Sequence, residues 1–214
     1  MSKDRIKMKK RARAAGVMFW GVLFMLASGF LHSQDLRVQL HAGAALPSDR
    51  QLGSSIESGF GAVLTLSRKF VAVLEYDSWQ SRVTDEPFRL YGGRLTAMPL
   101  SLSLRYNLLK RRALILYVSG GGSMVANRFS LDRLVTIPEV RISQTVKNAI
   151  GLRLGTGAEG RVSSRLFLFL EAAYLRAGAE ASTTVSDMNL GVSRKEFAIR
   201  LDSFHMRAGL RYAF

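Results

Sequence analysis

The sequence predicts an all-β protein, an eight-stranded antiparallel up-and-down transmembrane β-barrel preceded by a signal peptide. Three observations support this prediction: a leader typical of exported chains, repeated short segments in which apolar and polar residues alternate, and a last segment that ends on the aromatic residue Phe214. A β-strand sends successive side chains to opposite faces. Each alternating segment therefore predicts a strand with one apolar and one polar face.

Residues 1–33 predict a secretory signal peptide. Seven Lys and Arg residues crowd residues 3–13, and the apolar run Ala14–Leu31 follows. We expect cleavage near Ser33, so that residues 34–214 form the mature barrel domain. The apolar run is also nearly long enough for an uncleaved membrane anchor, and that alternative stays open.

The chain is strongly basic, with a formal net charge of +15. The leader holds seven of the 31 Lys and Arg residues and one of the 16 Asp and Glu residues, which leaves +9 on the mature part. In an exported chain without a recognisable nucleic-acid motif, this excess favours anionic lipid headgroups as partner and argues against nucleic acid. The absence of Cys excludes disulfides, thiol nucleophiles and cysteine-type zinc clusters.

Four alternating segments predict the first four strands. Leu36–Leu46 sets apolar residues against Arg, Gln and His, and Gly59–Ser67 and Phe70–Trp79 repeat the alternation on either side of a tight polar turn. Leu100–Leu108 alternates most clearly, because four Leu and one Tyr share a face opposite Ser, Arg and Asn. Proline cannot donate to a β-ladder, so we expect Pro99 to start this strand and to mark the rim of the apolar zone.

Four further segments complete the predicted barrel. Leu114–Ala126 is less regular and carries three central glycines, and Ile150–Glu159 alternates throughout. Leu166–Tyr174 sets Leu, Ala and Tyr on one face against Phe, Glu and Ala on the other. Phe204–Phe214 places aromatic and apolar residues on one face and small or cationic residues on the other. Its length fits the roughly 9–11 residues that a tilted strand needs to cross a bilayer.

The connections between these segments alternate in length. Transmembrane barrels have an even number of strands, short periplasmic turns and longer external loops, and carry aromatic girdles at both membrane boundaries. Three tight turns are predicted near Arg68, Arg111 and Ser164, and four longer loops near Asp49, Glu86, Val135 and Met188. The predicted girdles are Tyr106, Tyr212 and Phe214 at one rim and Tyr76 and Tyr174 toward the other.

The polar faces of the strands predict a charged interior. An eight-stranded barrel has an interior about wide enough for its side chains to fill, and buried charges are tolerated when they are paired. We therefore expect a closed lumen, with a small selective channel as the alternative. The predicted lumen charge network comprises Arg37, Glu75, Arg105, Arg153, Glu159, Glu171, Arg207 and Arg211.

Two patterns suggest other chemistry. Gly155–Gly160 matches the dinucleotide-binding pattern G-x-G-x-x-G, but no helix is predicted after it, so we expect no cofactor. Ser203 and His205 lie close to Asp202, as in the Ser/His chemistry of barrel-type lipid A deacylases. The parity set by Phe214 turns Ser203 and His205 inward and Asp202 outward, so we expect no enzyme, with a lipid-modifying enzyme as the alternative.

The predicted external loops are basic. They represent either a solvated rim or contacts with the phosphates of lipopolysaccharide, which the Arg side chain suits geometrically. Apolar residues between Leu131 and Val140 indicate either a small β extension beyond the membrane or contact with a partner. The candidate lipopolysaccharide contacts are Arg50, Arg82, Arg89, Arg128, Arg133, Arg194 and Lys195.

The mature chain resembles the small eight-stranded outer-membrane β-barrel domain, the OmpX/OmpA-like porin-family group. The leader, the strand Pro99–Tyr106, the glycine-rich segment Leu114–Ala126 and the terminal Leu210–Phe214 carry the resemblance. It implies insertion by the barrel-assembly machinery through a carboxyl-terminal signal made of Leu210, Tyr212 and Phe214. It further implies a non-enzymatic monomer in the outer membrane of a Gram-negative-type bacterium, with a role in envelope structure or surface interaction.

Overall fold

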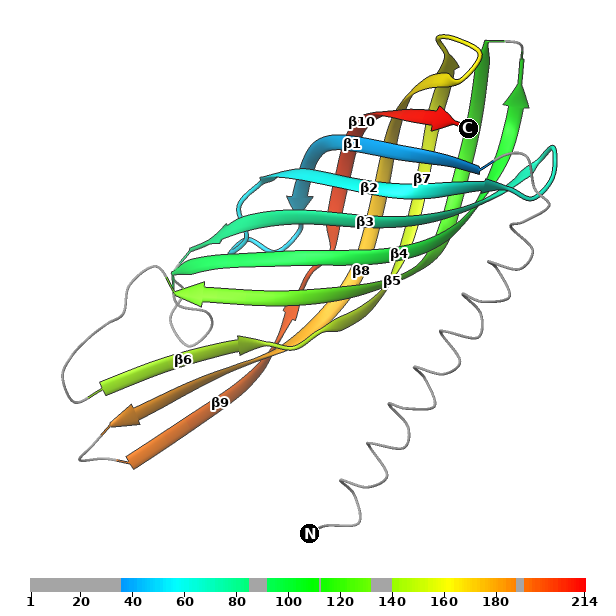
Figure 1. The fold of residues 1–214 in the computed structure, drawn as a ribbon. Helices are drawn as coiled ribbons and strands as arrows, with labels where there is room; N and C mark the ends of the chain where they lie inside the picture. The colour runs from blue at the N-terminus through cyan, green and yellow to red at the C-terminus, as the bar shows by residue number, and fades with distance from the viewer. Residues whose placement is uncertain (1–35, 85–91, 112, 132–139, 188–190) are drawn as a thin grey trace, which may run out of the picture.

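The computed structural model describes residues 36–84, 92–111, 113–131, 140–187 and 191–214. Within these ranges ten antiparallel strands form one sheet, and eight of them close into a barrel (Figure 1). The order around the barrel is β10-β1-β2-β3-β4-β5-β7-β8, with β8 paired back to β10. The predicted all-β antiparallel barrel is therefore confirmed. The predicted signal peptide lies outside the described residues, as does the whole span of residues 1–35.

The strands are long and regular. Their bounds are β1 (Leu36–Pro47), β2 (Ser55–Thr65), β3 (Phe70–Val83), β4 (Gly93–Lys110), β5 (Leu114–Leu131), β6 (Val140–Val146), β7 (Ala149–Arg161), β8 (Leu166–Asp187), β9 (Gly191–Arg200) and β10 (Ser203–Ala213). Among the described residues, no helix has both the length and the hydropathy that crossing a membrane requires.

The two ends of the barrel differ. At one end, called the turn end, the short connections β2–β3, β4–β5 and β7–β8 lie beside the start of β1 and the close of β10. The opposite end, called the loop end, carries the longer connections and a strand extension (Figure 1). This sorting of connections by length agrees with the sequence prediction and is typical of transmembrane barrels.

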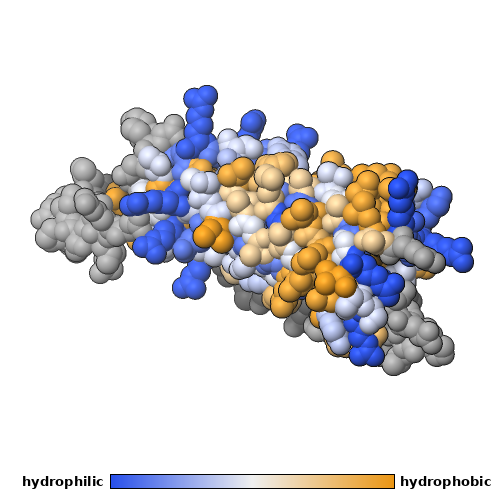
Figure 2. Space-filling model, turned by 90° about the horizontal axis from the view of Figure 1, so that it is seen from above, coloured by the Kyte–Doolittle hydropathy of each residue, from blue (hydrophilic) through white to orange (hydrophobic). Residues whose placement is uncertain are grey.

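Side chains on the barrel follow an inverted solvent pattern. Large apolar residues point outward, with Leu40 65% and Ile150 85% exposed, whereas inward Arg211 is 1% exposed. Figure 2 shows apolar residues gathered over the strands and hydrophilic residues toward the two ends. Rings pair on the outer face, Phe70 with Tyr106 at 5.3 Å between centroids near the turn end. Such an exterior suits hydrocarbon as its surroundings.

Two predicted loops contain strands instead. The segments 127–146 and 178–200 were expected to be polar loops, but β8 runs for 22 residues and its distal part pairs with β6 on one side and β9 on the other. The result is a three-stranded extension, β6–β8–β9, beyond the barrel rim (Figure 1). The β-branched, polar run Ser182–Val185 explains the miss, because it favours a strand without showing apolar alternation.

The prediction that Pro99 starts a strand is wrong. The strand β4 begins at Gly93, and Pro99 lies in its interior opposite Val125 of β5. On its other side the β3–β4 pairing runs through Tyr76↔Leu100 and resumes at Trp79↔Ala97. A proline without an N–H group is thus accommodated by a local gap in one ladder while the other ladder continues.

Apolar side chains fill the interior at the loop end. We call this cluster the apolar plug, and Phe129 and Phe197 pack against it. Its largest fully buried members are Trp79, Leu95, Leu175 and Leu201, each at most 1% exposed. The rest are Ala45, Leu52, Val83, Ala97, Val125, Val146, Ala149, Ala177, Ala179, Ala181 and Ile199. The charged part of the lumen therefore begins below the apolar plug.

Candidate functional site

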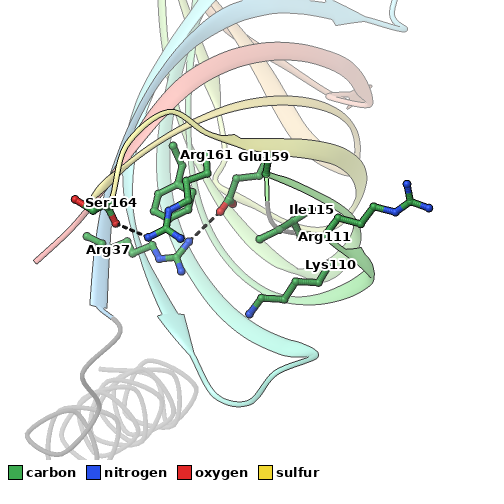
Figure 3. A pocket seen from close by; sticks show the side chains of 10 residues that line it. Arg37, Lys110, Arg111, Ile115, Glu159, Arg161 and Ser164 are labelled. Carbon is green, nitrogen blue, oxygen red and sulfur yellow. Dashed lines mark hydrogen bonds and ion pairs between the residues drawn. The ribbon is translucent and has the colours of Figure 1, made fainter.

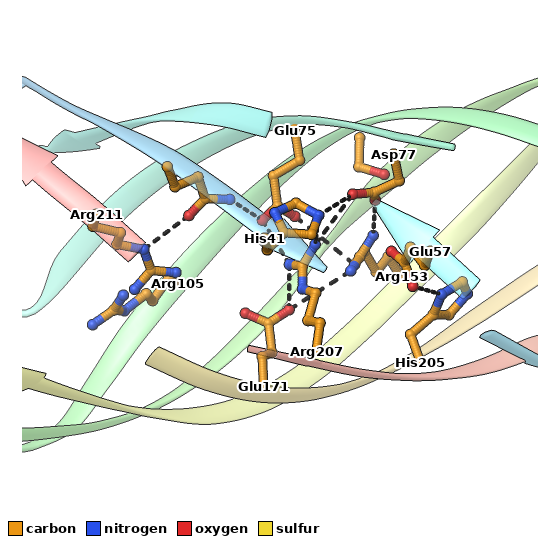
Figure 4. Close-up of polar contacts among 12 residues, drawn as sticks. His41, Glu57, Glu75, Asp77, Arg105, Arg153, Glu171, His205, Arg207 and Arg211 are labelled. Carbon is orange, nitrogen blue, oxygen red and sulfur yellow. Dashed lines mark hydrogen bonds and ion pairs between the residues drawn. The ribbon is translucent and has the colours of Figure 1, made fainter. Parts of the chain in front are cut away.

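Below the apolar plug, the centre of the lumen is a cross-linked set of charges. We call it the central cluster: Arg153, Arg207, Glu75, Asp77 and Glu171. Arg207 Nη2 donates to Glu75 Oε1 and to Glu171 Oε1, each at 2.6 Å (Figure 4). Arg153 Nη1 donates to Asp77 Oδ2 at 2.6 Å. The two guanidinium groups thereby join β3, β7, β8 and β10 through the interior, and burial strengthens each charge-assisted bond.

Nearer the turn end, three arginines converge on one carboxylate. We call this set the lower cluster: Arg37, Arg105, Arg211 and Glu159. Arg37 and Arg105 donate to Glu159 at 2.9 and 2.7 Å, and Arg211 donates to its Oε2 atom as well. The Arg105 guanidinium also lies 3.7 Å from the Tyr117 ring centroid. The lower cluster therefore carries a positive surplus, which aromatic faces partly stabilise.

One histidine, His205, lies next to the apolar plug and contacts a serine and a carboxylate. His205 Nε2 lies 2.7 Å from Ser203 Oγ, and His205 Nδ1 lies 2.5 Å from Glu57 Oε2. Asp202 does not take part, because its Oδ1 accepts a bond from the Ala177 backbone N–H at 2.9 Å. The chain Ser203–His205–Glu57 has the order of a nucleophile, a base and an orienting acid. All three residues are at most 1% exposed.

The sequence prediction missed Glu57 and Tyr117. The strand containing Glu57 was expected to begin at Gly59, whereas β2 begins at Ser55, so continuing the alternation by two residues would have found the carboxylate. Tyr117 donates to Glu171 Oε2 at 2.9 Å inside the lumen. The glycines of β5 obscured its alternation, so the inward face of that strand gave no clear signal.

One group of side chains resembles a metal site in composition. Single ligand atoms of His41, Glu57 and Asp77 lie within 4.8 Å of one another. Gly59 makes room for them, because a Cβ there would meet His41 Nε2 at 2.5 Å and Asp77 Oδ1 at 2.6 Å. However, Arg207 Nη1 lies 3.2 Å from His41 Nε2 and 3.3 Å from Asp77 Oδ1. A guanidinium at that distance repels a cation, so the arrangement favours an ion-pair network over a metal.

The turn end of the lumen opens into a cavity of about 220 Å³, which we call the vestibule (Figure 3). Its wall includes Arg37, Lys110, Arg111, Glu159, Arg161 and Phe167. The lower cluster forms its inner side, since Arg37 and Glu159 belong to both.

The other predicted site residues lie on the outside of the barrel or on its strand extension. Leu210, Tyr212 and Phe214 point outward, and the Tyr212 and Phe214 ring centroids are 5.5 Å apart. Arg50, Arg82, Arg128, Arg194 and Lys195 are exposed toward the loop end, and Arg194 pairs with Glu196 at 2.7 Å. Arg89 and Arg133 lie outside the described residues.

Comparisons with known proteins identify the fold. No protein-family model matches the sequence, and no curated protein matches it. OprG from Pseudomonas aeruginosa, an outer-membrane protein, superposes with a TM-score of 0.71 at 14% identity, over 85% of this chain and 96% of OprG. The outer-membrane protein AlkL gives 0.58 at 15% identity, over 85% and 90%. A major outer-membrane protein from Thermus thermophilus gives 0.55 at 15%, over 84% and 99%. The chain thus has the fold of small outer-membrane β-barrels.

Proposed function

We propose that this chain is a non-enzymatic protein of the outer membrane that acts in envelope structure or surface interaction through the loop end of its barrel. The fold shared with outer-membrane proteins supports this location, and the apolar outer face supports direct contact with lipid. The observation that carries the proposal is the filled interior, in which five arginines bond to four carboxylates beneath the apolar plug.

A filled interior predicts a barrel that does not conduct. An eight-stranded barrel has little room beyond its own side chains, and here both charged and apolar layers occupy the lumen. Planar-bilayer recordings of the full protein, purified from membranes, test this prediction. We expect no large, steady conductance. A stable conductance that rises with salt concentration would instead support a small-solute channel.

The loop end supplies the surface for interaction. Exposed arginines there suit bidentate contacts with lipopolysaccharide phosphates. The test compares lipopolysaccharide binding by the wild type and by a triple variant, Arg50→Gln, Arg128→Gln and Lys195→Gln. A matched control removes three bases at the turn end: Arg68→Gln, Lys69→Gln and Arg165→Gln. We expect weaker binding only in the loop-end variant, and equal losses in both variants would refute a loop-end site.

A lipid-modifying hydrolase is the second candidate function. The distances of 2.7 and 2.5 Å along Ser203–His205–Glu57 favour it, whereas the burial of Ser203 argues against access by a lipid. Reaction of the folded protein with a fluorophosphonate probe separates the two functions. We expect no labelling, and labelling that Ser203→Ala abolishes would establish the hydrolase.

A further inference from the structure

We infer that the vestibule at the turn end is a binding site for a phosphate group. The ligand class is a phosphate carried either by a soluble molecule or by a phospholipid headgroup. This inference concerns the opposite end of the barrel from the proposed interaction surface, so each can fail without the other.

The vestibule wall carries more positive than negative charge. Among its described lining residues, four are cationic, namely Arg37, Lys110, Arg111 and Arg161, and the one carboxylate is that of Glu159. Glu159 is also shared with Arg105 and Arg211 behind the wall. One carboxylate therefore faces a group of cations that it cannot neutralise, and a bound anion would offset part of the surplus.

The distribution of charge along the lumen adds to the excess of positive charge at the vestibule. The central cluster has two arginines and three carboxylates, whereas the lower cluster has three arginines and one carboxylate. Positive potential is thus concentrated at the turn end and negative potential deeper in the barrel. Low-dielectric walls focus such a field at the opening, so an anion is drawn to the vestibule and repelled from the layer beyond it.

The donors at the opening are already oriented. Arg161 donates through Nε to the Ser163 carbonyl at 3.0 Å and through Nη2 to the Ser164 carbonyl at 3.2 Å, which fixes its guanidinium without neutralising it. Arg37 lies 4.3 Å from the Phe167 ring centroid and donates through Nη1 to Glu159. Its buried Nε–H has no hydrogen-bond partner among the described residues. An unpaired buried donor is costly, so an acceptor oxygen in the vestibule that the Arg37 side chain turns to meet would satisfy it.

The side chains around the opening suit phosphate in particular. In Figure 3, Lys110 extends across the opening toward Arg37 and Arg161, whereas Arg111 points away. Two planar guanidinium groups and one ammonium can together contact several oxygens of one phosphate. The volume of about 220 Å³ admits the phosphate and part of its carrier. The clusters and the apolar plug fill the lumen beyond, so the vestibule binds its ligand without passing it onward.

Phosphate titration of the full protein, purified from membranes in a non-ionic detergent, tests the inference. The pocket variant is Lys110→Gln with Arg161→Gln, and the matched control is Arg68→Gln with Arg165→Gln, which removes equal charge at the same end without lining the vestibule. Each lost charge-assisted bond predicts about tenfold weaker binding. The pocket variant lacks two such donors, so we expect about hundredfold weaker binding of inorganic phosphate in it and little change in the control.

A second set of measurements distinguishes the sources of phosphate. If inorganic phosphate binds in detergent, a soluble ligand suffices. The phosphate of phosphatidylcholine is paired with its own choline cation, whereas that of phosphatidylglycerol is not. If inorganic phosphate does not bind in detergent, and phosphatidylglycerol in phosphatidylcholine nanodiscs binds the wild type but not the pocket variant, the ligand is an anionic headgroup. NMR of arginine Nε–H groups in the wild type provides a reading independent of the variants, and we expect the Arg37 resonance to shift with either ligand. Equal losses in pocket and control variants, or no phosphate-dependent shift of Arg37, would overturn the inference.

Discussion

Arg153 Nη1 lies 2.6 Å from Asp77 Oδ2, although 76 residues separate them in the sequence and their strands, β7 and β3, are not neighbours in the sheet. The bond therefore runs through the lumen and connects opposite walls of the barrel. Strand pairing alone closes the barrel around its circumference, whereas bonds of this kind fix its cross-section. These buried arginines therefore stabilise the barrel by linking strands across its interior.

Removal of the central guanidinium should destabilise the barrel strongly. Arg207→Met leaves Glu75 and Glu171 as buried carboxylates with one partner fewer, and breaking a buried ion pair in this way costs about 3–5 kcal/mol of unfolding free energy. Urea unfolding of the purified protein, followed by fluorescence of Trp79, measures the loss. Arg128→Met at an exposed position is the control and should change stability by less than about 0.5 kcal/mol. Equal stability of the two variants would show that the bonds of Arg207 across the interior do not stabilise the barrel.

The lower cluster should show strong coupling between partners. Glu159→Gln removes the carboxylate that Arg37, Arg105 and Arg211 share. We expect a large destabilisation that Arg105→Met in the same chain partly restores, because the double variant buries one uncompensated cation fewer. A double-mutant cycle from urea unfolding gives the coupling energy, expected at roughly 0.5–3 kcal/mol. Strictly additive losses would show that the residues do not act as a unit.

The carboxyl-terminal strand should depend on its last aromatic residue. Phe214→Ala is expected to reduce the amount of assembled barrel, since Phe214 is 72% exposed on the lipid-facing side beside Tyr212. The measurement is the fraction of outer-membrane protein whose gel mobility changes on boiling. Phe204→Ala, on the same face at the other end of β10, is the matched control. Similar assembly of both variants would argue against a terminal signal.

One ion pair outside the barrel predicts a pH response. Lys147 Nζ donates to Glu180 at 2.6 Å, and this hydrogen bond raises the pKa of Lys147 and lowers the pKa of Glu180. A lowered carboxyl pKa means that the pair is intact at neutral pH and is lost as pH falls through that value. In Lys147→Gln, the NMR titration midpoint of Glu180 should rise. An unchanged midpoint would show that the pair does not form in solution.

The alternation along the sequence predicted which side chains face the lumen, but not which of them form ion pairs or hydrogen bonds with one another. The parity of β7, β8 and β10 predicted inward positions for Arg153, Glu171 and Arg207, and these residues are 2%, 7% and 3% exposed. Their partners depend on strand tilt and on distances across the barrel, which a single strand's pattern does not contain. Arg37 and Glu159, for example, are 122 residues apart. Apolar residues between Leu131 and Val140 suggested a small β extension as one alternative, but the alternation did not predict β6, the distal part of β8 or β9, because polar strands exposed to water need no apolar face.

The central prediction is that hydrocarbon surrounds the barrel and that side chains fill its interior. Because the chain has no Cys, single cysteines can be introduced along β8 and spin-labelled in lipid bilayers. Labels at the outward Leu168 and Leu170 should collide often with oxygen, which dissolves in lipid, and labels at the inward Phe169 and Ala173 should be protected. The same oxygen accessibility at all four positions, or contact of the outward labels with a water-soluble nickel reagent, would contradict this prediction.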